Sequence, residues 1–557
     1  MKRLLTICAV GGIILSGGAA LGQGDWPMFN RDLLNSGVAD PSLAGVSDPI
    51  EKWSYTTDNS IGPGNPVIGD IDGDGVMEIL VPTANFRGTG GIYALNADGT
   101  LRWKYQTGDY GTYATPPLAD IDGDGKLETI FPSYGGKIVA VDEDGTEVWS
   151  VDKGSGGTRS VIADVTGDAA LEVVAGAAGK TFLLNASDGT QIWQAGFGMI
   201  SEPAIADVDG DGKLEVVFGA AGTRAVVALN AEDGTAVWAS PAASQDFQGN
   251  SAIVGDINGD GHPDVVAGAR DKKLYLFSGA DGTKLWDYTL VGRCFSAGVA
   301  DFDGDGHDDV ATTATKGDGV ESYVYLLDVK DQMLLWQHNI IGKQYYTTER
   351  SPSIADINGD GTPDLVISGL CQKLYALSGL DGSEIWTMDT SDPSAGVPAI
   401  GDLDGDGLTD IVVSAGSHVA AFTQVPPPVP SYACIGFDPP MDKGPVKVKK
   451  NRVLPLKAEL VDADGYPVTN TDVIAPPLIQ VMFDSGTGGD AVDVTDDALA
   501  AGHGTDGNQF EFSDGKWRFN LKTKDYTASG TYTVAMVSGD GSEYIIDPSC
   551  EAVFVIE

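Results

Sequence analysis

The stretch Asp120-Ile121-Asp122-Gly123-Asp124-Gly125-Lys126-Leu127-Glu128 is one of eight copies of a nine-residue motif, Asp-x-Asp/Asn-Gly-Asp-Gly-x-x-Glu/Asp. Successive copies begin 43 to 55 residues apart, and one of them is altered. A period in this range indicates an array of one supersecondary unit, so the repeat decides the fold before any local pattern does. The copies begin at Asp70, Asp120, Asp164, Asp207, Asp256, Asp301, Asp356 and Asp402.

Short apolar runs fill the rest of each period. In the fifth repeat, Val265-Val266-Ala267 follows the motif and Leu274-Tyr275-Leu276-Phe277 comes next, before an Asp-Gly-Thr turn and Trp286. These runs are too short for helices and are bounded by Gly, Asp and Asn, which is typical of strands. Four such strands in each period predict a β-propeller blade, with the acidic motif between the first and second strands.

The strands with which the repeat begins and ends along the chain predict how the propeller ring closes. The first unit supplies only the strand Glu51-Lys52-Trp53-Ser54-Tyr55, and the last unit ends at His418-Val419-Ala420-Ala421-Phe422 with no tryptophan after it. We therefore expect an all-β chain whose residues 51–424 form an eight-bladed β-propeller. The N-terminal strand completes the last blade and removes the edges that an open sheet would expose.

The N-terminal residues have the pattern of a secretory signal. Within residues 1–22, Lys2 and Arg3 precede an apolar stretch, and Ala20-Leu21-Gly22 forms a small-residue cleavage site. A membrane anchor is the alternative, but this glycine-rich run is short for a bilayer. We expect a secreted or cell-surface protein with no membrane span in the mature chain. Residues 23–50 form an N-terminal extension that we expect to pack across the propeller.

A second domain follows the repeats. The proline-rich linker 425–430 separates the propeller from residues 431–557, which lack the motif and alternate apolar and polar side chains. This pattern predicts a β-sandwich. Cys434 opens this domain and Cys550 nearly closes it, so a disulfide between its first and last strands is plausible in a secreted chain. Cys294 and Cys371 fall in neighbouring repeats, and their pairing stays open.

The net charge of −46, from 34 basic and 80 acidic residues, argues against a nucleic acid partner because no basic stripe offsets it. Many of the acids stand at positions 1, 3, 5 and 9 of the motif. Such carboxylates converge when the chain curls around an ion, the glycine at position 6 permits the turn, and position 7 offers its carbonyl oxygen. This oxygen-rich set suits Ca²⁺ better than Mg²⁺.

An Asp/Gly-rich turn without an ion is the alternative interpretation, but the acid recurs at position 9 in all eight copies. An EF-hand is excluded because its ligand set closes at position 12 between helices. The candidate calcium ligands are Asp70, Asp72, Asp74, Val76, Glu78, Asp120, Asp122, Asp124, Lys126, Glu128, Asp164, Asp168, Glu172, Asp207, Asp209, Asp211, Lys213, Glu215, Asp256, Asn258, Asp260, His262, Asp264, Asp301, Asp303, Asp305, His307, Asp309, Asp356, Asn358, Asp360, Thr362, Asp364, Asp402, Asp404, Asp406, Leu408 and Asp410.

The third copy differs from the others. Thr166 replaces the second acid and Ala169 replaces the turn glycine, which we expect to resist the turn. This loop should therefore bind calcium weakest or not at all. The chain as a whole is predicted to hold seven or eight Ca²⁺ ions.

Two motifs resemble known propeller families. The acidic motif followed by an apolar strand, as in residues 206–219, is similar to the FG-GAP/VCBS-type repeats of integrin α-chain propellers and their bacterial relatives. This resemblance implies calcium in the loops. The stretch from Ala94 to Trp103 resembles the tryptophan-docking motif of quinoprotein-like eight-bladed propellers, in which the tryptophan packs between neighbouring blades. The C-terminal part is similar to immunoglobulin-like domains.

We expect a calcium-stabilised scaffold for binding or adhesion, with an extracellular glycan or protein as ligand, rather than an enzyme. A polysaccharide lyase acting in the propeller cleft is the alternative, since calcium-containing eight-bladed propellers occur in that class. Quinoprotein dehydrogenases carry adjacent cysteines near the quinone. No two cysteines are adjacent here, so no quinone is expected. No catalytic residues are predicted.

The predicted ligand surface lies opposite the calcium loops. The loops that join successive repeats vary most, and variable loops on a rigid scaffold are where function usually resides. They carry aromatic side chains suited to sugar stacking and arginines suited to an anionic ligand. Local salt bridges, for example with Glu202 or Glu349, are the alternative for the arginines. The candidate ligand-binding residues are Tyr110, Tyr113, Arg159, Arg293, Tyr345, Tyr346 and Arg350.

Overall fold

The computed structural model confirms an all-β chain with two compact units, Met1–Val425 and Pro426–Glu557. No helix among the residues that it describes is long and apolar enough to cross a membrane. The structure describes residues 27–556, except positions 29, 41–42, 44, 60, 62–63, 86–89, 242, 248–251, 317–320, 342–350, 370–371, 391–395, 425–429, 474, 487–490, 496–498, 501–507, 525, 527 and 541–543. The predicted signal peptide and Cys371 lie outside the described residues.

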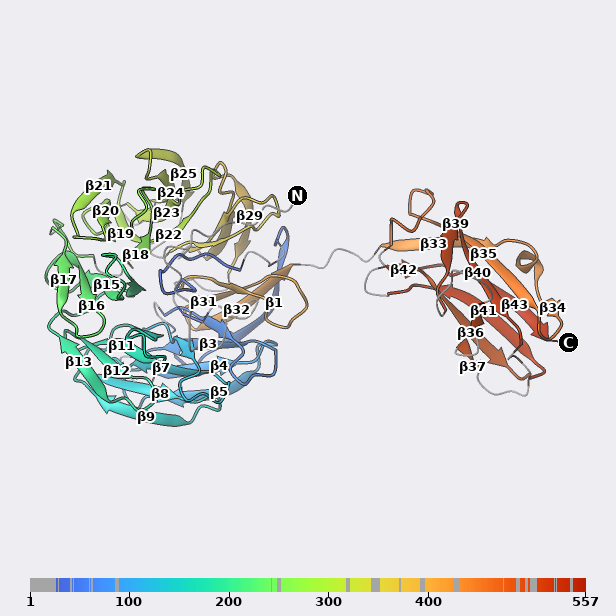
Figure 1. Ribbon diagram of the computed structural model, residues 1–557, viewed down its shortest axis with the longest axis horizontal. Helices are drawn as coiled ribbons and strands as arrows, with labels where there is room; N and C mark the ends of the chain where they lie inside the picture. Colours follow the sequence, from blue (N-terminus) through green and yellow to red (C-terminus); the bar gives the residue numbers. More distant parts are fainter. Residues whose placement is uncertain are drawn as a thin grey trace. The chain divides into compact units, whose positions relative to one another are not determined.

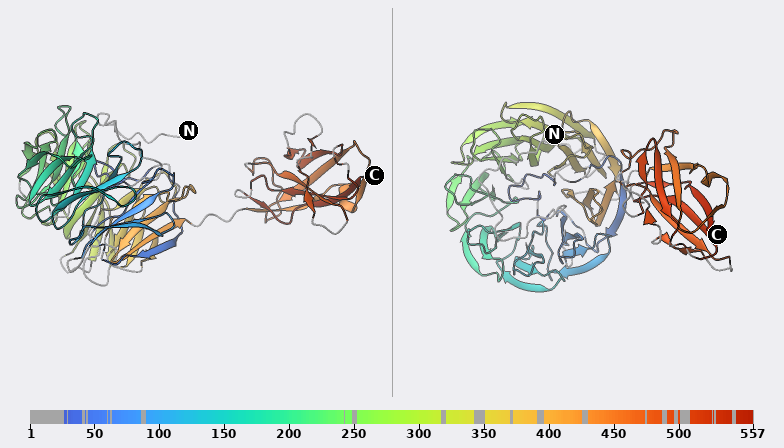
Figure 2. Two further views of the ribbon diagram at one scale, coloured as in Figure 1. Left: turned by 90° about the horizontal axis from the view of Figure 1, so that it is seen from below. Right: turned by 45° about the vertical axis from the view of Figure 1, so that its right-hand side comes forward.

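The first unit consists of antiparallel sheets of four strands, numbered here sheet 1 to sheet 8, which are arranged around a ring (Figures 1 and 2). Sheets 1 to 7 each use four consecutive strands. The first four sheets contain β2 (Val67–Gly69), β3 (Glu78–Thr83), β4 (Gly91–Leu95) and β5 (Leu101–Gln106); β6 (Leu118–Ala119), β7 (Glu128–Pro132), β8 (Lys137–Val141) and β9 (Glu147–Asp152); β10 (Ser160–Ala163), β11 (Glu172–Ala177), β12 (Lys180–Asn185) and β13 (Gln191–Ala195); β14 (Ala204–Ala206), β15 (Glu215–Ala220), β16 (Ala225–Asn230) and β17 (Ala236–Ala239).

The second half of the ring repeats this plan, and in every sheet the fourth strand is the least buried. Sheets 5 to 7 contain β18 (Ile253–Gly255), β19 (Asp264–Ala269), β20 (Lys273–Ser278) and β21 (Lys284–Thr289); β22 (Arg293–Ala300), β23 (Asp309–Thr315), β24 (Glu321–Asp328) and β25 (Met333–Ile341); β26 (Ser353–Ala355), β27 (Asp364–Gly369), β28 (Lys373–Leu377) and β29 (Glu384–Asp389).

Sheet 8 joins the two ends of the first unit. It contains β30 (Ala399–Gly401), β31 (Asp410–Ala415), β32 (His418–Gln424) and, as its fourth strand, β1 (Pro49–Thr56). The pairing is antiparallel, with Trp53 opposite Ala421 and Thr56 opposite His418. The N-terminal strand thus takes the place for which the last repeat has no strand of its own.

Six docking tryptophans, on the fourth strands of sheets 1 to 4, 6 and 8, donate to a turn of the next sheet. The Trp193 indole N–H donates to the carbonyl of Ala231 in the third turn of sheet 4, and a Cβ on Gly234 in that turn would lie 2.6 Å from the indole ring. Glycine is therefore required where the ring packs. Equivalent indole bonds run from Trp53 to Ala97, Trp103 to Glu143, Trp149 to Ala186, Trp238 to Gly279, and Trp336 to Gly379.

The tryptophan of sheet 7 docks differently. The chain has no turn between β32 and β1, because these strands lie at opposite ends of the first unit. The indole of Trp386 donates instead to the carbonyl of Val46, just before β1. The N-terminal segment therefore supplies both the last strand of sheet 8 and the acceptor that a turn provides elsewhere.

The segment before β1 also runs along the first strands of several sheets. The amide of Leu118 in β6 donates to Pro27, and the amide of Ile205 in β14 donates to Leu33. Val254 in β18 donates to Leu34, Val299 in β22 to Ser36 and Ile354 in β26 to Gly37. First strands of neighbouring sheets contact one another, so this segment lies on the inner side of the ring. The expectation that the N-terminal extension packs across the first unit is met for its described residues.

The second unit has two sheets that enclose one apolar core, which includes Trp517, Phe519 and Phe554. Alternate side chains are buried along its long strands, as the sequence pattern predicts. Cys434 and Cys550 form a disulfide. The elements are β33 (Ser431–Phe437), a 3-10 helix (Met441–Lys443), β34 (Val446–Val448), β35 (Val453–Val461), β36 (Leu478–Asp484), β37 (Val492–Asp493), β38 (Leu499–Ala500), β39 (Glu511–Ser513), β40 (Lys516–Lys522), β41 (Thr531–Val537), β42 (Ile545–Ile546) and β43 (Glu551–Ile556).

Replacing Gly282 with alanine tests the docking between sheets. The new Cβ would lie 2.5 Å from the ring of Trp238, so the indole must move away from the turn. We expect a loss of about 1–3 kcal/mol from overpacking, on top of the cost of placing alanine at φ +69°. Gly222→Ala is the matched control, because Gly222 has φ +73° and its added Cβ meets nothing within 4 Å. Equal losses of unfolding free energy in both variants would contradict this role of the glycine.

Candidate functional site

The eight acidic motifs connect the first and second strands of the eight sheets. The acid at position 9 is the first residue of the second strand in every case, and its exposed fraction is 3% or less. The strand register thus holds this carboxylate under the loop, while the other acids belong to the loop above it. These buried acids are Glu78, Glu128, Glu172, Glu215, Asp264, Asp309, Asp364 and Asp410.

Backbone amides hold each loop in the same shape. In the first loop, Asp70 accepts the amide of Gly73 at 2.8 Å and the amide of Gly75 at 2.9 Å. Asp74 accepts the amide of Val76 at 2.8 Å. The glycine at position 6 has a φ of +90°, a backbone conformation that favours glycine. The acids at positions 1 and 5 therefore also serve as turn residues.

One oxygen of the buried acid is used within the protein, and the acid also lies close to other carboxylates. Glu215 Oε2 accepts the amide of Val208 at 2.9 Å. Ligand atoms of Asp207, Asp209 and Glu215 all lie within 4.8 Å of one another. The same grouping occurs in the loops that begin at Asp70, Asp120 and Asp301. Three oxygens at this spacing fit a hard divalent cation.

Burial also disfavours the charged forms of these carboxylates. Burial, followed by the neighbouring acids of the loop, raises the pKa of Glu128 and of Glu215 to about 7 and that of Asp309 to about 8. In the fifth loop, Asp256 Oδ1 is buried and has no hydrogen-bond partner in the structure. A cation among these oxygens would favour their charged forms. The donor set therefore fits calcium, which would be held by the acids at positions 1, 3 and 9.

The third loop keeps the shape of the others, contrary to our expectation for Ala169. Ala169 adopts a φ of +73°, and its amide donates to Asp164 at 3.0 Å. Gly167 and Ala170 make the other two bonds of the turn. The expectation was wrong because bonds to the carboxylates of Asp164 and Asp168 offset the steric cost of a left-handed alanine. Thr166 still removes one carboxylate, so weak calcium binding there stays a prediction.

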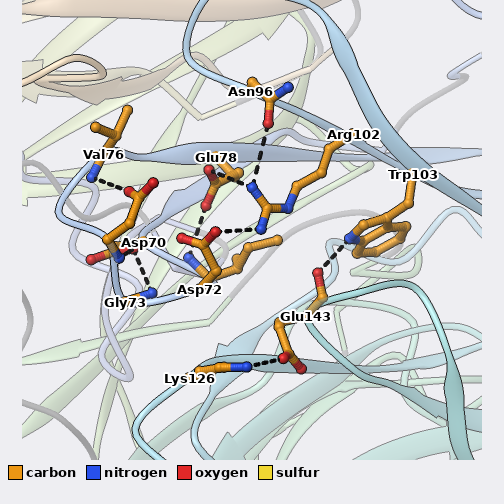
Figure 3. A network of polar contacts seen from close by, with 12 residues as sticks. Asp70, Asp72, Gly73, Val76, Glu78, Asn96, Arg102, Trp103, Lys126 and Glu143 are labelled. Carbon is orange, nitrogen blue, oxygen red and sulfur yellow. Dashed lines mark hydrogen bonds and ion pairs between the residues drawn. The ribbon is translucent and has the colours of Figure 1, made fainter.

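Two basic side chains that sequence reasoning missed lie among the acids. Arg102 contacts Asp72 and Glu78 of the first loop (Figure 3). Lys52 contacts Asp404 and Asp410 of the last loop. Both residues directly precede a docking tryptophan. An alignment of the eight repeats would have singled out this position, because it is apolar in the six other repeats.

The loop that joins sheets 1 and 2, together with the turn between the second and third strands of sheet 2, places three tyrosines together. Tyr134, between β7 and β8, packs edge-to-face against Tyr110 and Tyr113, with ring centroids 6.2 Å apart in both pairs. Tyr110 is 46% exposed and Tyr134 is 40% exposed. The sequence prediction included Tyr110 and Tyr113 but missed Tyr134, because Tyr134 lies in a different loop. Tyr345, Tyr346 and Arg350 lie outside the described residues.

The two described candidate arginines differ in environment. Arg159 Nε lies 3.1 Å from Glu202 Oε1, and both side chains are largely buried. Arg159 also donates to the carbonyl of Tyr113 at 2.9 Å. This geometry favours the salt-bridge alternative for Arg159. Arg159 would then stabilise the loop that carries Tyr113. Arg293 is exposed at the start of β22.

Two sequence families match parts of the chain. A family described as outer membrane protein assembly factor BamB matches residues 134–300, and a family described as FG-GAP-like repeat matches residues 301–367. No match was found among curated proteins. These local matches support a repeat β-propeller with both quinoprotein-like and FG-GAP-like features, as the two sequence motifs indicated.

Solved structures show the same fold at low sequence identity. The europium-containing methanol dehydrogenase superposes with a TM-score of 0.55 and 12% identity, covering 72% of this chain and 98% of that one. The quinohemoprotein alcohol dehydrogenase of Comamonas testosteroni gives 0.54 and 12%, covering 72% and 80%. The V. cholerae biofilm matrix protein Bap1 gives 0.52 and 15%, covering 68% and 91%. These likenesses show a propeller fold.

The raised pKa values predict how pH affects the protein when calcium has been removed by a chelator. Glu128 and Glu215 bind protons more tightly when folded, with a pKa of about 7 against 4.5. This contribution to stability is present below the unfolded pKa and is lost as pH rises through the folded pKa. We expect the melting temperature of the chelated protein to fall between about pH 5 and about pH 8.

Calcium should remove this dependence, because it favours the charged carboxylates. Thermal unfolding at several pH values, with chelator or with excess calcium, measures both curves. A chelated protein that becomes more stable as pH rises over this range would contradict the assignment.

Proposed function

We propose that this chain is a secreted, calcium-stabilised, eight-bladed β-propeller with an immunoglobulin-like C-terminal sandwich, and that it binds an extracellular glycan or protein. The observation that carries the proposal is that two sets of loops carry different kinds of side chain. Loops within the sheets gather buried carboxylates that suit calcium. The loop between sheets 1 and 2 and the turn between β7 and β8 present an exposed group of tyrosines. In this proposal calcium has a structural role.

The tyrosine group of Tyr110, Tyr113 and Tyr134 is the proposed centre of the ligand surface. Aromatic rings with polar tips suit sugar faces and protein contacts because they combine apolar area with a hydroxyl group. The N-terminal segment lies along the inner strands of five sheets. The loops that carry the tyrosine group are therefore the better-supported binding surface, compared with the middle of the ring. An extracellular location suits calcium loops and the disulfide of the second unit.

Chelation should lower the stability of the first unit. Each ion that binds only the folded state contributes about 2.7 kcal/mol at a concentration 100 times its dissociation constant. Because several loops would hold calcium, we expect a large fall in melting temperature after dialysis against a chelator. The melting temperature should recover when calcium is added. The second unit lacks the motif and provides an internal control. A melting curve of the first unit that is the same with and without bound calcium, verified by metal analysis, would contradict a stabilising role.

A glycan array and a panel of extracellular matrix proteins, probed with the full chain, test the binding function. Tyr110→Ala and Tyr134→Ala should each weaken binding to the ligand found at least several-fold, because each removes one exposed ring. Tyr466→Ala is the control, since Tyr466 is 69% exposed and lies in the second unit. Equal affinity of all three variants and the unaltered chain would place the ligand surface elsewhere.

A further inference from the structure

The residue before the docking tryptophan divides the eight repeats into two classes. It is apolar in six repeats, where Val148, Ile192, Val237, Leu285, Leu335 and Ile385 occupy it. It is basic in the other two, where it is Arg102 in sheet 1 and Lys52 in sheet 8. The two basic residues lie on fourth strands, β5 and β1. Each reaches the acidic loop of its own sheet.

Arg102 lies where the first loop would hold an ion. Its guanidinium Nη2 pairs with Asp72, and Nη1 lies 3.4 Å from Glu78 Oε1. Asp72 and Glu78 are positions 3 and 9, whose oxygens lie within 4.8 Å of one another and of Asp70. Figure 3 shows the guanidinium directed at both carboxylates. A planar guanidinium offers several donors to neighbouring carboxylates and keeps its charge.

Lys52 repeats this arrangement in the last loop. Its ammonium lies 2.8 Å from Asp404 Oδ2 and 3.1 Å from Asp410 Oδ2. These acids again occupy positions 3 and 9, and the Asp410 side chain is fully buried. Two different basic residues thus make the same bridge from the same position in the repeat.

Other lysines near the loops do not make this bridge. Lys330 pairs with Asp305, the acid at position 5 of the sixth loop, and both side chains are partly exposed. Lys126 and Lys213, at position 7 of their loops, pair with Glu143 and Glu232 in neighbouring turns. The bridge between positions 3 and 9 therefore does not follow simply from having a lysine near an acidic loop.

We propose that Arg102 and Lys52 act as built-in cations that replace calcium in the first and last loops. A basic group between the acids at positions 3 and 9 repels a divalent ion and already satisfies the oxygens that would bind it. This inference rests on the proposed calcium function of the other loops. It lowers the expected number of tightly bound ions from seven or eight to six, or five if the third loop also stays empty.

The two loops belong to the sheets on either side of the junction where β1 closes the ring. Trp53, next to Lys52, docks on the turn of sheet 1 that precedes Arg102. The chain itself therefore supplies one positive charge to each of the acidic loops that flank this junction. The ring then closes through β1 without calcium. The acidic loops in the middle of the chain still need calcium.

Calcium anomalous scattering from crystals of the full chain tests the inference loop by loop. We expect an ion in the loop that begins at Asp207 and none in the loops that begin at Asp70 and Asp402. Ions in these two loops, with an occupancy equal to that at Asp207, would overturn the inference and leave the proposed function intact. Absence of calcium from all eight loops in calcium-saturated crystals would instead overturn the proposed function, and this inference with it.

Reciprocal substitutions test the same point in solution. Arg102→Val and Lys52→Val carry an apolar residue of the kind found in the other repeats, and each should gain about one equivalent of tightly bound calcium by equilibrium dialysis. Val148→Arg places the basic group beside the complete second loop, and it should lose about one equivalent. Circular dichroism in excess calcium verifies the fold of each variant. Folded valine variants with an unchanged calcium count would overturn the inference, and the wild-type crystal remains decisive if a variant does not fold.

Discussion

The packing of a tryptophan against a glycine-containing turn of the next sheet is the contact on which the ring depends. A four-stranded sheet of this size has two faces to cover, and burial of an indole removes about 150–250 Å² of surface from water. The indole N–H is satisfied by a backbone carbonyl, so the large side chain is buried without an unpaired donor. Glycine in the turn leaves the space that the ring occupies. The repeat of this contact sets the spacing of the sheets.

Closure of the ring uses the same contact with different parts of the chain. Sheet 8 has no turn between its third and fourth strands, and the carbonyl of Val46 receives the indole of Trp386. The segment that precedes Val46 runs along the inner strands before β1 completes sheet 8. The N-terminal segment therefore links sheets that are far apart in sequence. Loss of β1 would expose the edge of sheet 8 and remove Trp53 from its place against sheet 1.

The second constraint is electrostatic. A carboxylate at the start of each second strand is buried beneath a loop that carries further acids, so the site needs positive charge to keep them ionised. The proposed solution is calcium in most loops and a basic side chain in two. The fold itself does not specify a ligand, because propellers of this kind also include dehydrogenases. The exposed tyrosine group, rather than the shared architecture, carries the proposal of a binding function.

The sequence alone determined the features that depend on local spacing. The repeat of the acidic motif and of the tryptophan predicted strands, turns and the order of the sheets. The alternating pattern after the linker predicted the second unit, and the positions of Cys434 and Cys550 suggested the disulfide that the structure contains. These features were accessible because a turn, a strand or a repeat is encoded by residues within one period.

Only the tertiary structure decided which distant side chains meet. The approach of Arg102 and Lys52 to the acidic loops, the grouping of Tyr134 with Tyr110, and the pairing of Arg159 with Glu202 all join residues from different strands or loops. At Ala169 the sequence alone predicted the wrong result. Hydrogen bonds to Asp164 and Asp168 hold a turn that the conformational preference of alanine opposes. Such contacts depend on strand register and on the packing of whole sheets, which residue spacing within a single repeat does not specify.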